Sequence, residues 1–133
     1  MQAEGLVRRV LIVDCDVHQG DGTAAILAGD PSVFTFSIRA RRNFPFRKQA
    51  SDLDIELPDA TGDEEYLAAL EGGLRSALSA SQADLAIYLA GADPFEGGRL
   101  ARLALTKPGL SARDQRVLAT CREAGVAVAV TMA

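Results

Sequence analysis

The stretch VLIVDCDVHQGDG, residues 10–22, decides the fold class. Its first four residues are apolar without a break, and a polar segment with three aspartates and one histidine follows directly. A continuous apolar run of this kind is typical of a strand that is buried on both faces of a parallel sheet. Ligands of open α/β sheets bind at the carboxyl ends of such strands. The stretch therefore predicts a buried strand that leads into a binding loop.

Strands and helices are predicted to alternate along the rest of the chain. Apolar runs predict further strands at 33–38, 53–57, 85–90 and 126–130, the second of these at a sheet edge. Helices are expected at 23–28, from a Thr61/Glu64 capping box to about residue 80, and from Ser111 to Gly125. Residues 39–50 are polar and basic and predict a solvated loop. The order predicts an α/β fold, a mainly parallel sheet with flanking helices.

Length and composition restrict the classes of protein to consider. The chain has 133 residues, 48% of them hydrophobic, and no apolar run long enough to cross a membrane. Its net charge of −4 argues against general nucleic-acid binding, and two cysteines are too few for a disulfide scaffold. With no secretion signal, we expect a cytoplasmic protein. Buried strands close to both ends predict that residues 1–133 form a single partial domain, truncated at both ends. No motif predicts an oligomeric state.

Two polar segments at strand ends offer candidate metal ligands. On extended backbone Asp14, Asp16 and His18 point to the same side, so that Asp16 and His18 can reach one zinc or other transition-metal ion. Asp93 follows the strand at 85–90 and can complete a three-ligand site if the two strands are neighbours. Such a site leaves a position open for substrate, as in catalytic zinc centres. The alternative is that these aspartates cap helices or bind loop amides.

Five segments of the chain resemble the histone deacetylase family, in its bacterial and class IV-like branch. They are VDCDVHQGDGT at 13–23, DPSVFTFSI at 30–38, NFPFRKQ at 43–49, LAGADPFEG at 89–97 and LALT at 103–106. The resemblance implies an arginase/deacetylase-like fold. It also implies a zinc-dependent deacetylase, an amidohydrolase that acts on acetyl-lysine-like or other acylated amines.

The resemblance also implies roles for individual residues. Asp16, His18 and Asp93 match the family's zinc ligands, and Fe²⁺ could take the place of zinc because this ligand set discriminates weakly. Asp14 and Asp21 match aspartates that orient two catalytic histidines. A structural K⁺ site is expected from five residues, the last two forming a turn: Asp14, Asp16, His18, Ser37 and Ile38.

The chain departs from the family pattern in its proton-transfer groups. The family's tandem histidines should precede Asp14, and its Gly-Gly-Tyr motif should follow the final strand, but this chain contains neither. Its one histidine is already assigned to zinc, so no imidazole is left to act as general base. We therefore expect weak or absent deacetylase activity from these residues alone. The alternatives are an inactive metal- or ligand-binding remnant and a truncated product that does not fold stably.

Overall fold

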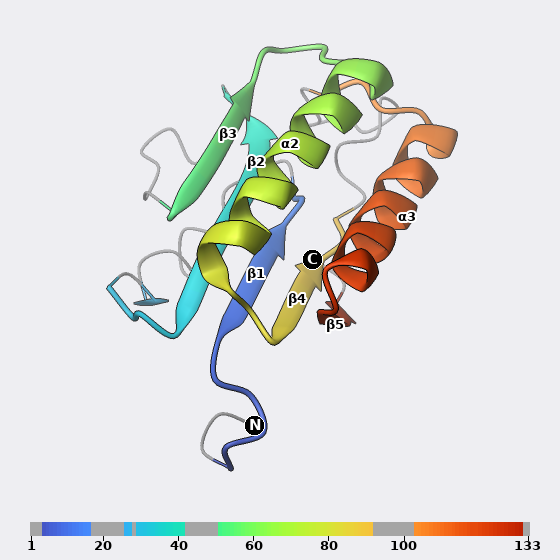
Figure 1. The fold of residues 1–133 in the computed structure, drawn as a ribbon. Coiled ribbons are helices and arrows are strands. Elements are labelled where there is room, and N and C mark those ends of the chain that lie inside the picture. Colours follow the sequence, from blue (N-terminus) through green and yellow to red (C-terminus); the bar gives the residue numbers. More distant parts are fainter. Residues whose placement is uncertain (1–3, 17–25, 28, 42–50, 92–102, 132–133) are drawn as a thin grey trace.

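The computed structural model describes residues 4–16, 26–27, 29–41, 51–91 and 103–131. Within them the chain forms one sheet and two helices (Figure 1). The strands are β1 (Val10–Asp14), β2 (Val33–Ala40), β3 (Leu53–Leu57), β4 (Leu85–Leu89) and β5 (Ala127–Thr131), and the helices are α2 (Asp63–Ser81) and α3 (Lys107–Glu123).

The sheet has the strand order β3-β2-β1-β4-β5, and every neighbouring pair is parallel. The carboxyl ends of all five strands therefore lie at one edge of the sheet (Figure 1). The predicted α/β architecture with a parallel sheet is confirmed. The strand nearest the start of the chain, β1, lies at the centre, as its continuous apolar run predicts.

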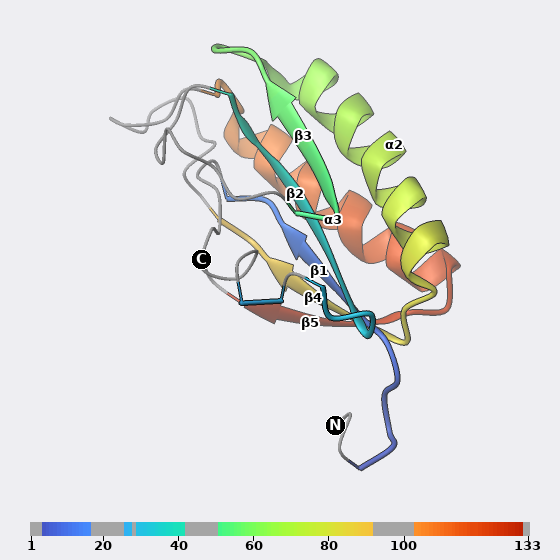
Figure 2. The same ribbon diagram turned by 90° about the vertical axis from the view of Figure 1, so that its left-hand side faces the viewer.

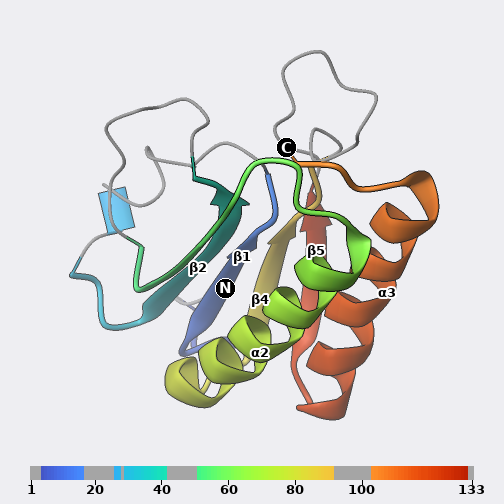
Figure 3. The same ribbon diagram turned by 90° about the horizontal axis from the view of Figure 1, so that it is seen from above.

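Helices α2 and α3 lie side by side on the same face of the sheet (Figures 2 and 3). Side chains that alternate along the strands fill the space beneath them, among them Leu11 and Val13 of β1 and Phe36 and Ile38 of β2. Helix α2 approaches the sheet closely at Gly73. A Cβ atom there would come within 2.5 Å of the Ile55 side chain and 2.8 Å of the Phe36 ring. Only glycine allows this backbone to lie so close to β2 and β3.

The two helix starts differ from the predictions. The Thr61/Glu64 capping box is wrong, because Gly62 is the N-cap of α2 and the Thr61 hydroxyl donates to the carbonyl of Pro58 at 2.7 Å. Helix α3 begins at Lys107, ahead of the predicted Ser111, because the Thr106 hydroxyl accepts from the Gly109 amide at 3.0 Å. Residues 107–109 contain a proline at an early helical position. In the sequence, such a proline is compatible with the start of a helix and equally with a loop.

Residues 39 and 40 belong to β2, not to the loop predicted over 39–50. The remaining strand predictions are confirmed to within a residue or two at each end. Of the helix predicted at 23–28, Ile26 and Leu27 are helical, and the other four positions lie outside the described residues. In the described part of the chain, neither helix is both long and apolar enough to cross a membrane.

Candidate metal centre

The carboxyl ends of β1 and β4 are neighbours, as the predicted metal site requires. The strands pair in parallel, with Asp14 opposite Leu89. His18 follows Asp14 by four positions (18 − 14), and Asp93 follows Leu89 by four positions (93 − 89). The strands that precede the two predicted ligands in the sequence thus end at paired positions. Asp93, His18 and Asp21 themselves lie outside the described residues, so their predicted roles remain predictions.

Asp14 is the last residue of β1, and the residue is 7% exposed. Its Oδ1 accepts a hydrogen bond from the backbone amide of Asp16 at 3.0 Å. The Cys15 amide donates to the carbonyl of Leu89 at 3.1 Å, so the pairing with β4 continues one step beyond the strand. This hydrogen bond matches the alternative interpretation of the strand-end aspartates, in which they bind amides of the following loop. It also restrains the backbone at Asp16.

Asp16 is the one predicted zinc ligand among the described residues, and it is half-buried at the carboxyl edge of the sheet. No set of three or more His, Cys, Asp and Glu side chains within the described ranges is arranged to hold a metal ion. The chemistry of the predicted donor set nevertheless fits zinc, because two carboxylates and one imidazole are common zinc ligands. The pairing of the strands that precede these residues in the sequence fits the same interpretation.

The predicted potassium site falls partly on β2. Ser37 pairs with Asp14 across β1 and β2, which brings two of its predicted residues together. The predicted turn at Ser37 and Ile38 is wrong, because both residues lie inside β2. The side chain of Ile38 is fully buried in the apolar core, so only its main-chain oxygen could contact a cation. The Ser37 hydroxyl accepts a long hydrogen bond of 3.4 Å from Arg39.

Arg39 is buried beside this site, which the sequence interpretation of a solvated basic loop did not anticipate. Its side chain is 3% exposed and forms ion pairs with Asp54 at 2.6 Å and Glu56 at 3.0 Å. Both carboxylates come from the neighbouring strand β3, where Glu56 is the register partner of Arg39. A buried guanidinium of this kind needs such partners to offset the loss of hydration.

A second buried arginine contacts the segment that leads from β4 toward the predicted ligand Asp93. The guanidinium of Arg113, on α3, donates to the carbonyl of Gly91 at 2.6 Å and lies over the Tyr88 ring. Burial raises the pKa of the nearby Cys15 thiol to about 12, and the positive charge of Arg113 opposes this increase. The thiol is therefore protonated at neutral pH. No local signal in the sequence indicates that Arg113 is buried.

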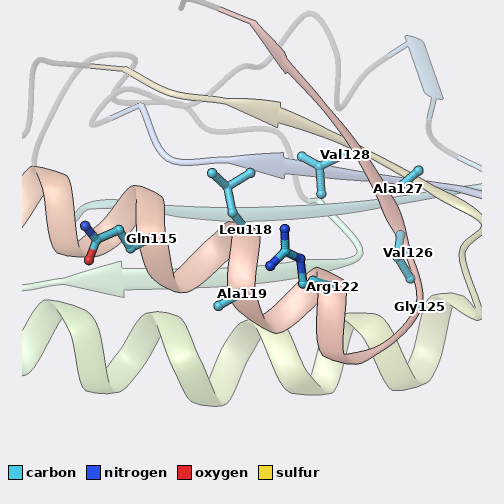
Figure 4. Close-up of a pocket in the computed structure, with 8 residues that line it drawn as sticks. All are labelled: Gln115, Leu118, Ala119, Arg122, Gly125, Val126, Ala127 and Val128. Atoms are coloured by element: carbon cyan, nitrogen blue, oxygen red, sulfur yellow. The ribbon is translucent and has the colours of Figure 1, made fainter.

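One groove among the described residues is remote from these strand ends. It has a volume of about 640 Å³ and lies between the last turns of α3 and the start of β5 (Figure 4). Leu118 and Val128 line it, together with Arg122 and the turn at Gly125. The start of β5 lies at the amino-terminal edge of the parallel sheet. The groove therefore does not include the predicted metal ligands.

Comparison with known proteins relates the chain to one protein family. The family model described as "Histone deacetylase domain" matches residues 1–132. An uncharacterized protein of Picosynechococcus sp. is 51% identical over 129 residues, which cover 97% of this chain and 43% of that protein. Histone deacetylase 2 of Arabidopsis thaliana is 32% identical over 123 residues, covering 90% of this chain and 32% of that protein. The chain thus spans less than half the length of these relatives.

Solved structures show the same fold. A crystal structure of an HDAC homolog complexed with SAHA matches with a TM-score of 0.80 at 20% identity, covering 98% of this chain and 38% of that one. The HD domain of HDA15 matches with a TM-score of 0.78 at 26% identity, covering 98% of this chain and 41% of that one. The sheet and its two helices are therefore part of an arginase/deacetylase fold.

Proposed function

The chain belongs to the histone deacetylase domain family, and we propose that it carries the metal-binding part of a zinc-dependent deacetylase. The substrate class is an acetyl-lysine-like or other acylated amine. The observation that carries this proposal is the parallel pairing of β1 with β4, which places Asp14 opposite Leu89. The segments that hold all three predicted ligands begin at that pair. A metal-dependent amidohydrolase needs several protein donors that converge on one ion.

Asp16, His18 and Asp93 would hold the zinc ion. Zinc supplies Lewis acidity toward the amide carbonyl of the substrate. Asp14 fixes the backbone through the Asp16 amide, and we propose that Asp14 and Asp21 also orient catalytic histidines. A K⁺ ion on Asp14, Asp16, His18, Ser37 and Ile38 would then have a structural role. Fe²⁺ is an alternative to zinc with the same donors.

The proton-transfer groups are not among these residues. The 133 residues contain one histidine, which the proposal assigns to zinc. General-base catalysis typically contributes about 10² to 10⁴ in rate, so a deacetylase limited to these residues should still hydrolyse substrate, but only weakly. This single histidine favours a second candidate function, a metal- or ligand-binding remnant without turnover.

Hydrolysis of an acetyl-lysine peptide by the zinc-loaded protein distinguishes these functions. The deacetylase proposal predicts slow but detectable acetate release that a chelator abolishes and zinc restores, and that Asp16→Asn removes. Asp84→Asn is the matched control, because Asp84 lies at the opposite, amino-terminal edge of the sheet. There it accepts hydrogen bonds from the amides of Arg8 and Arg9. Zinc binding with no acetate release would favour the remnant. Neither zinc binding nor hydrolysis would overturn both candidates.

A further inference from the structure

Arg113 connects helix α3 to the end of β4. Its Nη1 donates to the main-chain carbonyl of Gly91 at 2.6 Å, although the side chain starts on a different element. Gly91 lies two positions before Asp93 in the sequence. A hydrogen bond from a charged donor is shorter and stronger than a neutral one. Arg113 therefore restrains the backbone at the point where the chain leaves the sheet toward Asp93.

The guanidinium is itself held in place by two other side chains. Asp114 Oδ1 accepts from Arg113 Nε at 3.0 Å, and the Tyr88 hydroxyl donates to the same oxygen at 2.6 Å. The Arg113 Cζ lies 5.9 Å from the centroid of the Tyr88 ring, within the range of a cation–π contact. With its side chain 3% exposed, Arg113 has little freedom to adopt another orientation.

Asp114 alone could neutralise the charge of a structural arginine. Arg113 forms an additional bond that charge neutralisation does not require. Its buried Nη1 donates to the main-chain oxygen of Gly91, next to the segment that contains the predicted ligand Asp93. Arg116, one turn along α3, shows the ordinary alternative: it is 45% exposed and pairs with Glu71 of α2 at 3.0 Å. On one helix, Arg113 thus forms a buried contact with the backbone, whereas Arg116 forms an ion pair at the surface.

We propose that Arg113 is a positioning residue, which fixes the end of β4 and so the direction in which the chain enters the metal ligand Asp93. This inference rests on the proposed metal-binding function. Groups that orient metal ligands typically contribute about 10- to 100-fold to metal affinity. We expect a contribution of this size to metal affinity from Arg113, which would act through Gly91 without contacting the metal or the substrate.

The test compares Arg113→Met with the matched surface variant Arg116→Met, using two measurements. Amide hydrogen exchange at Ala90 and Gly91 reports the backbone without any metal. Titration with Co²⁺, followed by its visible absorption, reports affinity and coordination geometry. We expect Arg113→Met to accelerate exchange and to weaken Co²⁺ binding at least tenfold with an altered spectrum, and Arg116→Met to match the wild type. Arg113→Lys, which keeps the charge, should recover part of the affinity.

The outcomes separate this inference from the proposed function. Unchanged exchange in folded Arg113→Met, or accelerated exchange with wild-type Co²⁺ affinity and spectrum, overturns the positioning role alone. A wild-type protein that binds no Co²⁺ overturns the proposed function, and the positioning role with it. Tyr88→Phe keeps the ring and removes the hydroxyl, which bonds to Asp114 and also to the Cys15 thiol, so it carries the test if Arg113→Met does not fold. We expect about threefold weaker Co²⁺ binding there, and wild-type affinity would contradict the inference.

Discussion

Arg39 of β2 donates to Asp54 of β3 at 2.6 Å, across two strands that form one side of the sheet. The side chains are 3% and 21% exposed. Their strand neighbours Ile38 and Ile55 pack in the core beneath α2, so Arg39 and Asp54 lie on the opposite face. The pair forms a buried polar layer beside Ser37, on the sheet face that does not contact the two described helices.

Removing Asp54 should destabilise the fold more than removing Glu56. Asp54→Ala leaves a nearly buried guanidinium without its closest partner, which we expect to lower the free energy of unfolding by about 2–3 kcal/mol. Glu56 is 38% exposed and its bond to Arg39 is longer, at 3.0 Å, so Glu56→Ala should cost about 1 kcal/mol or less. Urea unfolding of both variants measures the difference. Equal losses would show that Arg39 depends no more on Asp54 than on Glu56.

Two adjacent glycines of α2 should respond in opposite ways to alanine. Gly73→Ala forces a Cβ against Ile55 and Phe36, and overpacking of this kind costs about 1–3 kcal/mol. No atom outside the helix lies within 4 Å of a Cβ placed at Gly72, so Gly72→Ala should stabilise the helix by about 0.5–1 kcal/mol. Thermal unfolding of the two variants provides the measurement. A Gly73→Ala protein as stable as the wild type would contradict the close packing of α2 on the sheet.

The amino-terminal edge of the sheet should become less stable in acid. The amides of Arg8 and Arg9 donate to Asp84 at 2.9 and 3.1 Å, and these bonds lower the pKa of its carboxyl below the ordinary value of 3.8. A lowered pKa in the folded state stabilises the protein above pH 3.8, and this contribution is lost as the pH falls through the lowered pKa. Asp84→Asn should remove this part of the acid dependence. Identical pH profiles of unfolding for the variant and the wild type would contradict the prediction.

The parallel sheet could be predicted because its signal is local. Apolar runs mark β1 and β4 in the sequence, and parallel strands place their carboxyl ends at one edge of the sheet. The sequence leaves open whether β1 and β4 are neighbours, and the strand order establishes that they are. The buried arginines could not be predicted in this way. Arg39 is buried because of carboxylates on β3, and Arg113 because of the Gly91 carbonyl beyond β4. These partners are distant in sequence, and the arginines themselves look like solvated residues in a polar segment.

The first residues of the two helices also could not be predicted from the local sequence pattern. The Thr61 hydroxyl donates backward to Pro58 and is not available to cap α2. The Asp63 carboxylate instead accepts from the amide of Thr106 at 2.9 Å and so joins the first turn of α2 to the N-cap of α3. A sequence motif lists residues that can cap a helix, but the tertiary contact between the two helices determines which of them do.

The location of bound zinc tests the central claim most directly. Crystals of the protein grown with zinc, measured at the zinc absorption edge, give the position of the ion by anomalous scattering. We predict one strong peak beyond the paired ends of β1 and β4, with oxygens of Asp16 and Asp93 and a nitrogen of His18 at about 2 Å. An ordered zinc ion bound elsewhere, or no peak at these ligands at saturating zinc, would contradict the account.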